Sequence, residues 1–231
     1  MSRVYFASMY VQESVYDRFA EQNHDRLMHF IWHSAGNPLL SAMRGTLFEE
    51  HVHRRLASDE SFEVRRLDEP AEGSGDEVER VTFGKLSTLM VHGVSDIRAG
   101  RYCRPQTRNF ESIDAVVAPS SLFQITVGEK HPVKSNGLAQ LQPQLASSGP
   151  IRLYFVVPPD RWGSFKRQSY VTKKGELAWV WWHGAAAQSG WARCAGEEAK
   201  VVRAWIRERV QQYALKLGPT PTPGDEGRQS A

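Results

Sequence analysis

Residues 113–127 read IDAVVAPSSLFQITV. Two short runs rich in β-branched and apolar residues, 113–118 and 122–127, flank the Pro-Ser-Ser segment at 119–121. Such runs on either side of a turn segment predict a β-hairpin. Asp114 stands inside the first run, where a strand interior prefers an apolar side chain, because a buried carboxylate costs free energy unless it is paired, hydrogen-bonded or metal-bound. The stretch therefore predicts a sheet and one polar position that needs an explanation.

Helical periodicity precedes this hairpin. Apolar residues recur at helical spacing over 10–33 and, after an interruption at 36–38, over a second segment that ends near residue 56. We expect this second helix to begin near Asn37, with Pro38 in its first turn.

Other segments complete an α/β or α+β pattern with a mixed sheet. We expect strands over 62–67, 78–86 and 153–157, the last buried on both faces. A mobile loop is expected over 69–76, which is rich in proline, glycine, serine and acids. A short helix is expected over 135–146, although Pro143 weakens its second half.

The last third of the chain is expected to extend this core. Tryptophans cluster at 177–183, in a strand or a turn-rich segment, and the pattern over 199–217 predicts an amphipathic helix. The chain is thus divided into an N-terminal helical segment (1–35), a core (36–168), a tryptophan-rich and helical extension (169–217) and a disordered tail (218–231).

Composition excludes several classes of protein. No apolar run approaches the length of about 20 residues that spans a bilayer, so no membrane span is expected. No apolar signal-peptide core is present and the chain has two cysteines, which fits an intracellular protein without a disulfide framework. Residues 59–80 hold nine acidic residues and three arginines, whereas the rest of the chain holds 26 basic and 17 acidic residues. An acidic segment therefore masks a basic body, which permits contact with nucleic acid.

Common catalytic motifs are missing. No glycine-rich phosphate loop is present, so no nucleotide cofactor is expected, and neither a GxSxG elbow nor an HExxH or CxxC motif occurs. Gln124 and Thr126 share one face of the second hairpin strand, in a hydrogen-bonded core or a site wall. Lys130, His131 and Lys134 follow this strand, either as a solvated loop or as cations that stabilise a transition state.

Four blocks, taken together, resemble one family. They are RGTLFEEHVH (44–53), YCRPQTRNFESIDA (102–115), LFQITVGEKHPVK (122–134) and LYFVVP (153–158). Over residues 11–168 the sequence is similar to the nuclease-like domain of Crinkler-type effectors and retrotransposon hot spot proteins, a divergent branch of the PD-(D/E)xK restriction-endonuclease-like superfamily. The resemblance implies an αβββαβ core with a mixed central sheet flanked by helices, to which the N-terminal helices and a C-terminal helix are added.

The resemblance also implies the site residues. It makes Glu49 the helix acid, with Glu50 as the fallback, Asp114 the hairpin acid, and Gln124 the residue at the second acid position. These three residues would bind Mg²⁺ or Mn²⁺, which prefers oxygen ligands and lowers the pKa of an attacking water. His53, four residues after Glu49 on the same helix face, would hold Glu49 or serve as a packing histidine.

One position departs from the family pattern. The motif lysine should follow Gln124 by two residues, but Thr126 stands there. Either the lysine has migrated, with Lys134 the preferred and Lys130 the second candidate, or the site is weak or inactive.

Basic residues near these blocks suggest contact with a nucleic-acid backbone. The candidates are Arg101, Arg104, Arg108 and Lys130, and contacts of this kind weaken with salt. Stacking of bases on the tryptophans is less expected than packing of a C-terminal subdomain.

The sequence therefore predicts a metal-dependent endonuclease domain that hydrolyses phosphodiester bonds, with DNA the expected substrate. The alternative is a degraded nuclease fold that binds nucleic acid or a host protein without cleaving. An NTPase module in a longer parent protein and location in the nucleus are expected from the resemblance alone.

Overall fold

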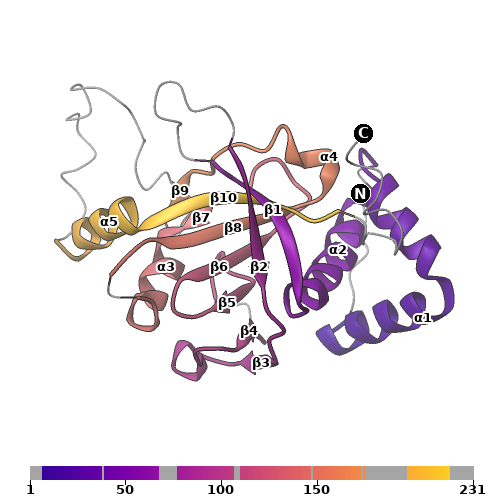
Figure 1. The fold of residues 1–231 in the computed structure, drawn as a ribbon, viewed down its shortest axis with the longest axis horizontal. Coiled ribbons are helices and arrows are strands. Elements are labelled where there is room, and N and C mark those ends of the chain that lie inside the picture. The colour runs from indigo at the N-terminus through magenta and orange to yellow at the C-terminus, as the bar shows by residue number, and fades with distance from the viewer. Residues whose placement is uncertain are drawn as a thin grey trace.

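The helices and strands come from a computed structural model of the chain (Figure 1). It describes residues 7–37, 39–67, 77–106, 110–146, 148–172, 174 and 197–218. The helices are α1 (Met9–His33), α2 (Ser41–Leu56), α3 (Ser135–Leu141), α4 (Pro159–Trp162) and α5 (Glu197–Arg209), with 3₁₀ turns at Val94–Asp96 and Gln142–Gln144. The main strands are β1 (Glu60–Arg66), β2 (Val78–Phe83), β3 (Thr88–Val91), β4 (Tyr102–Pro105), β5 (Ala115–Val117), β6 (Ser121–Ile125), β8 (Ile151–Val157) and β10 (Val210–Lys216). Two short strands, β7 (Val133–Lys134) and β9 (Tyr170–Val171), pair with each other.

An eight-stranded mixed sheet forms the centre, in the order β2-β1-β10-β8-β6-β5-β4-β3. Strands β10, β8 and β6 run parallel to one another, whereas β4, β5 and β6 form an antiparallel meander. One apolar cluster packs the sheet against α3 and α5, and the other packs it against α1 and α2. Figure 1 shows these helix pairs at opposite ends of the view. The predicted α/β class, a mixed sheet flanked by helices, is confirmed.

The expected order of core elements is present. Helix α2 precedes the meander β4-β5-β6, helix α3 follows it, and β8 then pairs in parallel with β6. This is a helix, three strands, a helix and a strand, with β1, β2 and β3 inserted after the first helix. The predicted hairpin is confirmed, since β5 and β6 pair antiparallel with Val116 opposite Leu122.

The second helix begins later than the sequence suggests. It starts at Ser41 rather than near Asn37. The side chain of Asn37 instead accepts the N–H of Leu39 (3.0 Å), which closes a local turn one helical turn early. The predicted helix over 135–146 is likewise shorter and ends at Leu141, with a 3₁₀ turn at Pro143.

The prediction of a helix over 199–217 is wrong in its second half. Helix α5 ends at Arg209, and the next residues form strand β10 between β1 and β8. Val210 and Ala214 pack on one face of the sheet, while Tyr213 and Leu215 pack on the other. Seven residue pairs align β10 with β8. The hydrogen bonds between these strands and burial on both faces of the sheet therefore outweigh the helical spacing of the apolar residues. Part of the predicted C-terminal extension therefore belongs to the central sheet.

Some predictions fall outside the residues that the structure describes. They are the loop 69–76, the tryptophan cluster 177–183, Arg108 and the tail after Gly218. Across the described ranges, no helix combines the length and apolar character needed to cross a membrane.

Gly137 is where α3 packs against the segment that leads to Asp114. A Cβ atom there would overlap the carbonyl oxygen of Glu111. We expect Gly137→Ala to lower the free energy of unfolding by about 1–3 kcal/mol, because α3 or the 110–113 segment must shift. Gly163→Ala, at a glycine with open space around its Cα, is the control and should change it by less than about 0.5 kcal/mol in urea unfolding. If Gly137→Ala changed the free energy of unfolding no more than Gly163→Ala, the contact between residue 137 and the carbonyl of Glu111 would be relieved without cost.

Candidate active site

Helix α2 carries two adjacent acids that face different surroundings. Phe48 and Val52 are fully buried against the sheet and fix the rotation of the helix. The side chain of Glu49 is 41% exposed, whereas that of Glu50 is 3% exposed. Only Glu49 is therefore accessible to a substrate or a hydrated ion.

Glu50 belongs to a buried ion-pair network. Its carboxylate accepts from Arg104 of β4 (2.8 Å) and lies 3.1 Å from Arg54. Arg104 also lies 3.2 Å from Glu13 of α1. These contacts tie α1, α2 and the sheet together, so Glu50 is a structural residue.

Asp114 comes just before β5, at the open end of the hairpin. The backbone N–H of Ile125 donates to its Oδ2 (2.6 Å), so the carboxylate replaces a backbone acceptor where the strand ladder ends. Burial and the negative charge of Glu49 raise the pKa of Asp114 to about 7, although the hydrogen bond from Ile125 and the charge of Arg104 oppose the shift. Asp114 is thus hydrogen-bonded to the backbone of β6 and also interacts electrostatically with Glu49.

The pKa of Glu49 shifts in the opposite direction. Burial alone would raise it, but His53, followed by Arg104 and His131, holds the pKa of this carboxyl below its usual value. His53 Nε2 lies 3.7 Å from Glu49 Oε1. Near neutral pH, Glu49 therefore carries the negative charge and Asp114 is the acid of the pair that more readily holds a proton. Two neighbouring acids with opposed shifts are typical of functional sites.

His53 connects Glu49 to the sheet. It is 4% exposed, and its Nδ1 lies 2.7 Å from the hydroxyl of Tyr102, which is fully buried in β4. Sequence spacing predicted the contact of His53 with Glu49. It gave no signal for Tyr102, because a tyrosine 49 residues away is brought near only by the fold.

Gln124 lies in a different environment. It alternates with Phe123 and Ile125, which pack toward α2, and its partner across the ladder is Phe155, which packs in the cluster on the α3 side. Its side chain therefore points to the face that α3 covers. Gln124 is fully buried, and neither Nε2 nor Oε1 has a hydrogen-bond partner among the described residues. An unsatisfied buried amide is costly and marks a place where water or a ligand would bind.

Thr126, which stands at the position of the motif lysine, and Lys134, the preferred replacement, both make polar contacts. Thr126 Oγ1 accepts the N–H of Gly128 (3.0 Å) and closes the turn after β6. Lys134 Nζ lies 3.6 Å from Glu111 Oε1, and its backbone N–H donates to Ser112 Oγ (2.8 Å). Lys134 is thus anchored to the segment immediately before Asp114, with its side chain 40% exposed.

The donor set fits one hydrated cation better than a closed metal cage. Among the described residues, no three His, Cys, Asp or Glu side chains are grouped to hold a metal ion. Mg²⁺ commonly binds one or two carboxylates and keeps several waters. Glu49 and Asp114 meet that demand, whereas the orphaned amide of Gln124 faces the α3 side of the sheet, away from Glu49.

The predicted phosphate contacts differ in accessibility. Arg101 and Lys130 are exposed, and Arg101 donates to Ser87 Oγ. Arg104 is only 6% exposed, and its guanidinium pairs with Glu50 and Glu13. Arg104 therefore has a structural role, because its guanidinium is buried and paired and is not accessible to a phosphate.

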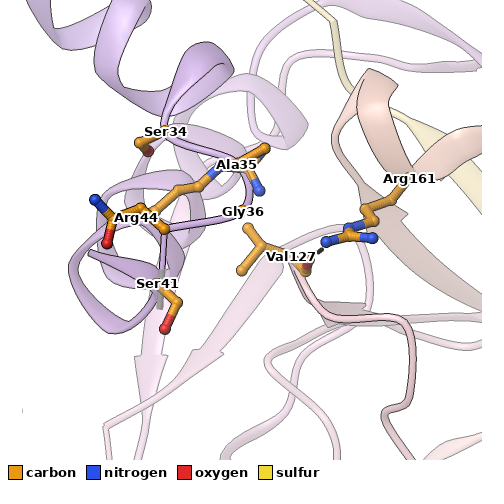
Figure 2. Close-up of a pocket in the computed structure, with 8 residues that line it drawn as sticks. Ser34, Ala35, Gly36, Ser41, Arg44, Val127 and Arg161 are labelled. Atoms are coloured by element: carbon orange, nitrogen blue, oxygen red, sulfur yellow. Dashed lines mark hydrogen bonds between the residues drawn. The ribbon is translucent and has the colours of Figure 1, made fainter. Parts of the chain in front are cut away.

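A separate pocket lies between the α1–α2 turn and α4 (Figure 2). Its volume is about 180 Å³, and it is lined by Ser34, Ala35, Gly36, Asn37, Ser41, Arg44, Val127 and Arg161. Arg44 lies 2.5 Å from Asp160, and Arg161 lies 2.6 Å from Glu129. Both cations already have carboxylate partners, so the pocket offers no uncompensated charge for a phosphate.

Comparison with known proteins relates the chain to one group of effectors. It is 30% identical to Crinkler effector protein 16 of Phytophthora infestans over 163 residues, which cover 65% of this chain and 25% of that protein. It is 29% identical to Crinkler effector protein 15 of the same organism over 159 residues, or 64% of this chain and 24% of that protein. No protein-family model and no solved structure matches. The chain spans about a quarter of the length of the curated relatives it matches. Over about two thirds of its own length, the chain is therefore similar to Crinkler effector proteins.

Proposed function

We propose that this chain is an effector module that hydrolyses phosphodiester bonds of nucleic acid, with DNA as the substrate and Mg²⁺ or Mn²⁺ as the cofactor. The observation that carries the proposal is the pair Glu49 and Asp114, two neighbouring carboxyls from α2 and the hairpin whose pKa values shift in opposite directions. The order of helix, meander, helix and parallel strand supports a restriction-endonuclease-like core. Similarity to Crinkler effectors supports the effector role.

Each residue has a defined part in this proposal. Glu49 and Asp114 would hold the ion, whereas the side chain of Gln124 faces the α3 side of the sheet and is left out of the proposed ligands. When bound, the ion would polarise the phosphate and lower the pKa of a bound water. The partly exposed carboxylate of Glu49 would accept a proton from that water. Lys134 is held beside the segment that carries Asp114, and its positive charge would stabilise the negative charge on the phosphate in the transition state.

A second function is favoured by a different observation. Thr126 replaces the motif lysine, and the ammonium of Lys134 already lies 3.6 Å from Glu111. If no lysine reaches the phosphate, the fold would bind nucleic acid or a host protein without cleaving it. Exposed Arg101 and Lys130 would then contact the phosphate backbone, and binding would weaken steeply with salt.

Cleavage of plasmid and single-stranded DNA by the purified chain tests the proposal. We expect product with Mg²⁺ or Mn²⁺ and none with EDTA. Lys134→Ala should lower the single-turnover rate about a hundredfold, because a preorganised charge on the transition state is lost. Lys85→Ala, an exposed lysine between β2 and β3, is the matched control and should retain most of the rate.

The outcomes separate the two functions. Metal-independent product would contradict the proposed metal cofactor. Equal rates for both lysine variants and the wild type would contradict the role of Lys134. Salt-sensitive binding of DNA without product, in either metal, would favour the binding function.

A further inference from the structure

Among the described residues, each ring nitrogen of His53 has a polar neighbour, and the two neighbours lie on different elements. Nδ1 lies 2.7 Å from the hydroxyl of Tyr102, and Nε2 lies 3.7 Å from Glu49 Oε1. The rings of His53 and Tyr102 meet edge to face, with centroids 5.8 Å apart. The buried imidazole therefore bridges a strand hydroxyl and the carboxylate of the proposed site.

The chemistry of these three side chains determines which group donates and which accepts in each contact. A carboxylate only accepts, so its charge favours a proton on Nε2 of His53. In a neutral imidazole with the proton on Nε2, Nδ1 is an acceptor, so the hydroxyl of Tyr102 must donate to it. Both side chains are buried, which disfavours a charged ring and a phenolate.

We infer that Tyr102 and His53 are positioning residues that orient the carboxylate of Glu49 through the Nε2–H tautomer of His53. The inference rests on the proposed function only in giving Glu49 a catalytic task. The separation of 3.7 Å exceeds a direct hydrogen bond, and catalytic contacts of this kind often shorten when substrate binds. The arrangement resembles other sites in which an outer group sets the tautomer of a histidine that in turn acts on the reacting group.

The same helix offers a matched control. His51, two residues earlier, receives an equivalent contact, since its Nδ1 lies 2.7 Å from the hydroxyl of Tyr16. This pair joins α1 to α2, and Nε2 of His51 has no hydrogen-bond partner among the described residues. Tyr16→Phe therefore removes the same bond to a buried histidine without touching the contact of His53 with Glu49.

Histidine tautomers are read directly by long-range ¹H–¹⁵N NMR of the ¹⁵N-labelled chain, with His53→Gln used to assign the signal. In the wild type, we expect His53 to carry its proton on Nε2. Tyr102→Phe should shift the ¹⁵N signal of the acceptor nitrogen Nδ1 of His53, which loses its donor, whereas Tyr16→Phe should move only the signals of His51. A wild-type His53 protonated on Nδ1 overturns the inference without any variant, as does a His53 signal that Tyr102→Phe leaves unchanged.

Kinetics supply the second measurement. Tyr102→Phe should lower the cleavage rate about 10–100-fold at an unchanged KM, whereas Tyr16→Phe should leave both nearly unchanged. A rate equal to that of the wild type overturns the positioning role. Absence of cleavage by the wild-type chain would refute the proposed function, whereas the tautomer measurement would still decide the inference.

Discussion

Asp114→Asn is expected to reduce metal-dependent cleavage about a thousandfold while the protein stays folded. The loss follows because one of the two carboxylates that hold the ion is removed, and such metal stabilisation is worth several kcal/mol in the transition state. The asparagine side chain keeps an oxygen that accepts the N–H of Ile125, so the end of the hairpin stays capped. Single-turnover cleavage with saturating Mn²⁺ measures the effect.

A matched aspartate controls for loss of the structural bond. Asp96 also accepts backbone N–H groups, from His92 and Gly93 (both 3.0 Å), but it lies in a separate turn. Asp96→Asn should therefore cleave at nearly the wild-type rate. If Asp114→Asn retained that rate as well, Asp114 would be no more than a strand cap and the proposed ion site would be wrong.

Asp114→Asn should also change how the stability of the protein depends on pH. Because the pKa of Asp114 is raised to about 7, the folded protein binds more protons than the unfolded chain between about pH 4 and 7. In metal-free buffer, the wild type should therefore lose stability as the pH rises through this window, by up to about 4 kcal/mol. Urea unfolding of Asp114→Asn should lack this component, so a neutral-pH stability equal to or above that of the wild type is expected. A variant that follows the wild-type pH curve would contradict the shift.

Glu50→Ala is expected to lower the free energy of unfolding by about 3–5 kcal/mol. The substitution leaves the buried guanidinium of Arg104 without its 2.8 Å partner, and an uncompensated buried charge is strongly destabilising. Urea unfolding at neutral pH measures the loss. The remaining contact with Glu13 at 3.2 Å places the expected value toward the lower end of the range.

Glu49→Ala, one residue earlier, is the matched control with the opposite outcome. Its side chain is 41% exposed, so its loss should change stability by less than about 1 kcal/mol. It should nevertheless remove most of the cleavage activity, because Glu49 is the charged member of the acid pair. If Glu50→Ala were the milder change for stability and the more damaging for cleavage, the helix acid of the site would be Glu50.

The alternating and continuous apolar runs of the chain predicted much of the fold. The 113–127 stretch gave the hairpin, and the run around Phe155 gave a central strand buried on both faces. These predictions succeed because the period of apolar residues is local, and burial on one or both faces requires that period. The same logic failed for 210–216, whose spacing also suits a helix, because the open edges of β1 and β8 were not visible in the sequence.

The candidate site was predicted in part. Glu49 and Asp114 were named from the sequence, and the structure brings them close enough that the charge of Glu49 raises the pKa of Asp114. The choice of Glu49 over Glu50 follows from the rotation of α2, which Phe48 and Val52 set by packing. The separate face of Gln124 follows from its register with Phe155 in β8.

By itself, the sequence determined the class of fold and the hairpin, since these depend on residue type and short-range spacing, and its resemblance to one family named the acids worth testing. The tertiary structure alone decided which acid is buried, which arginine is already paired and which tyrosine reaches His53. Those outcomes depend on contacts between residues far apart in the chain, such as Arg104 with Glu50 and Tyr102 with His53. A buried charge or hydroxyl is stable only beside a partner, and only the assembled sheet and helices supply that partner.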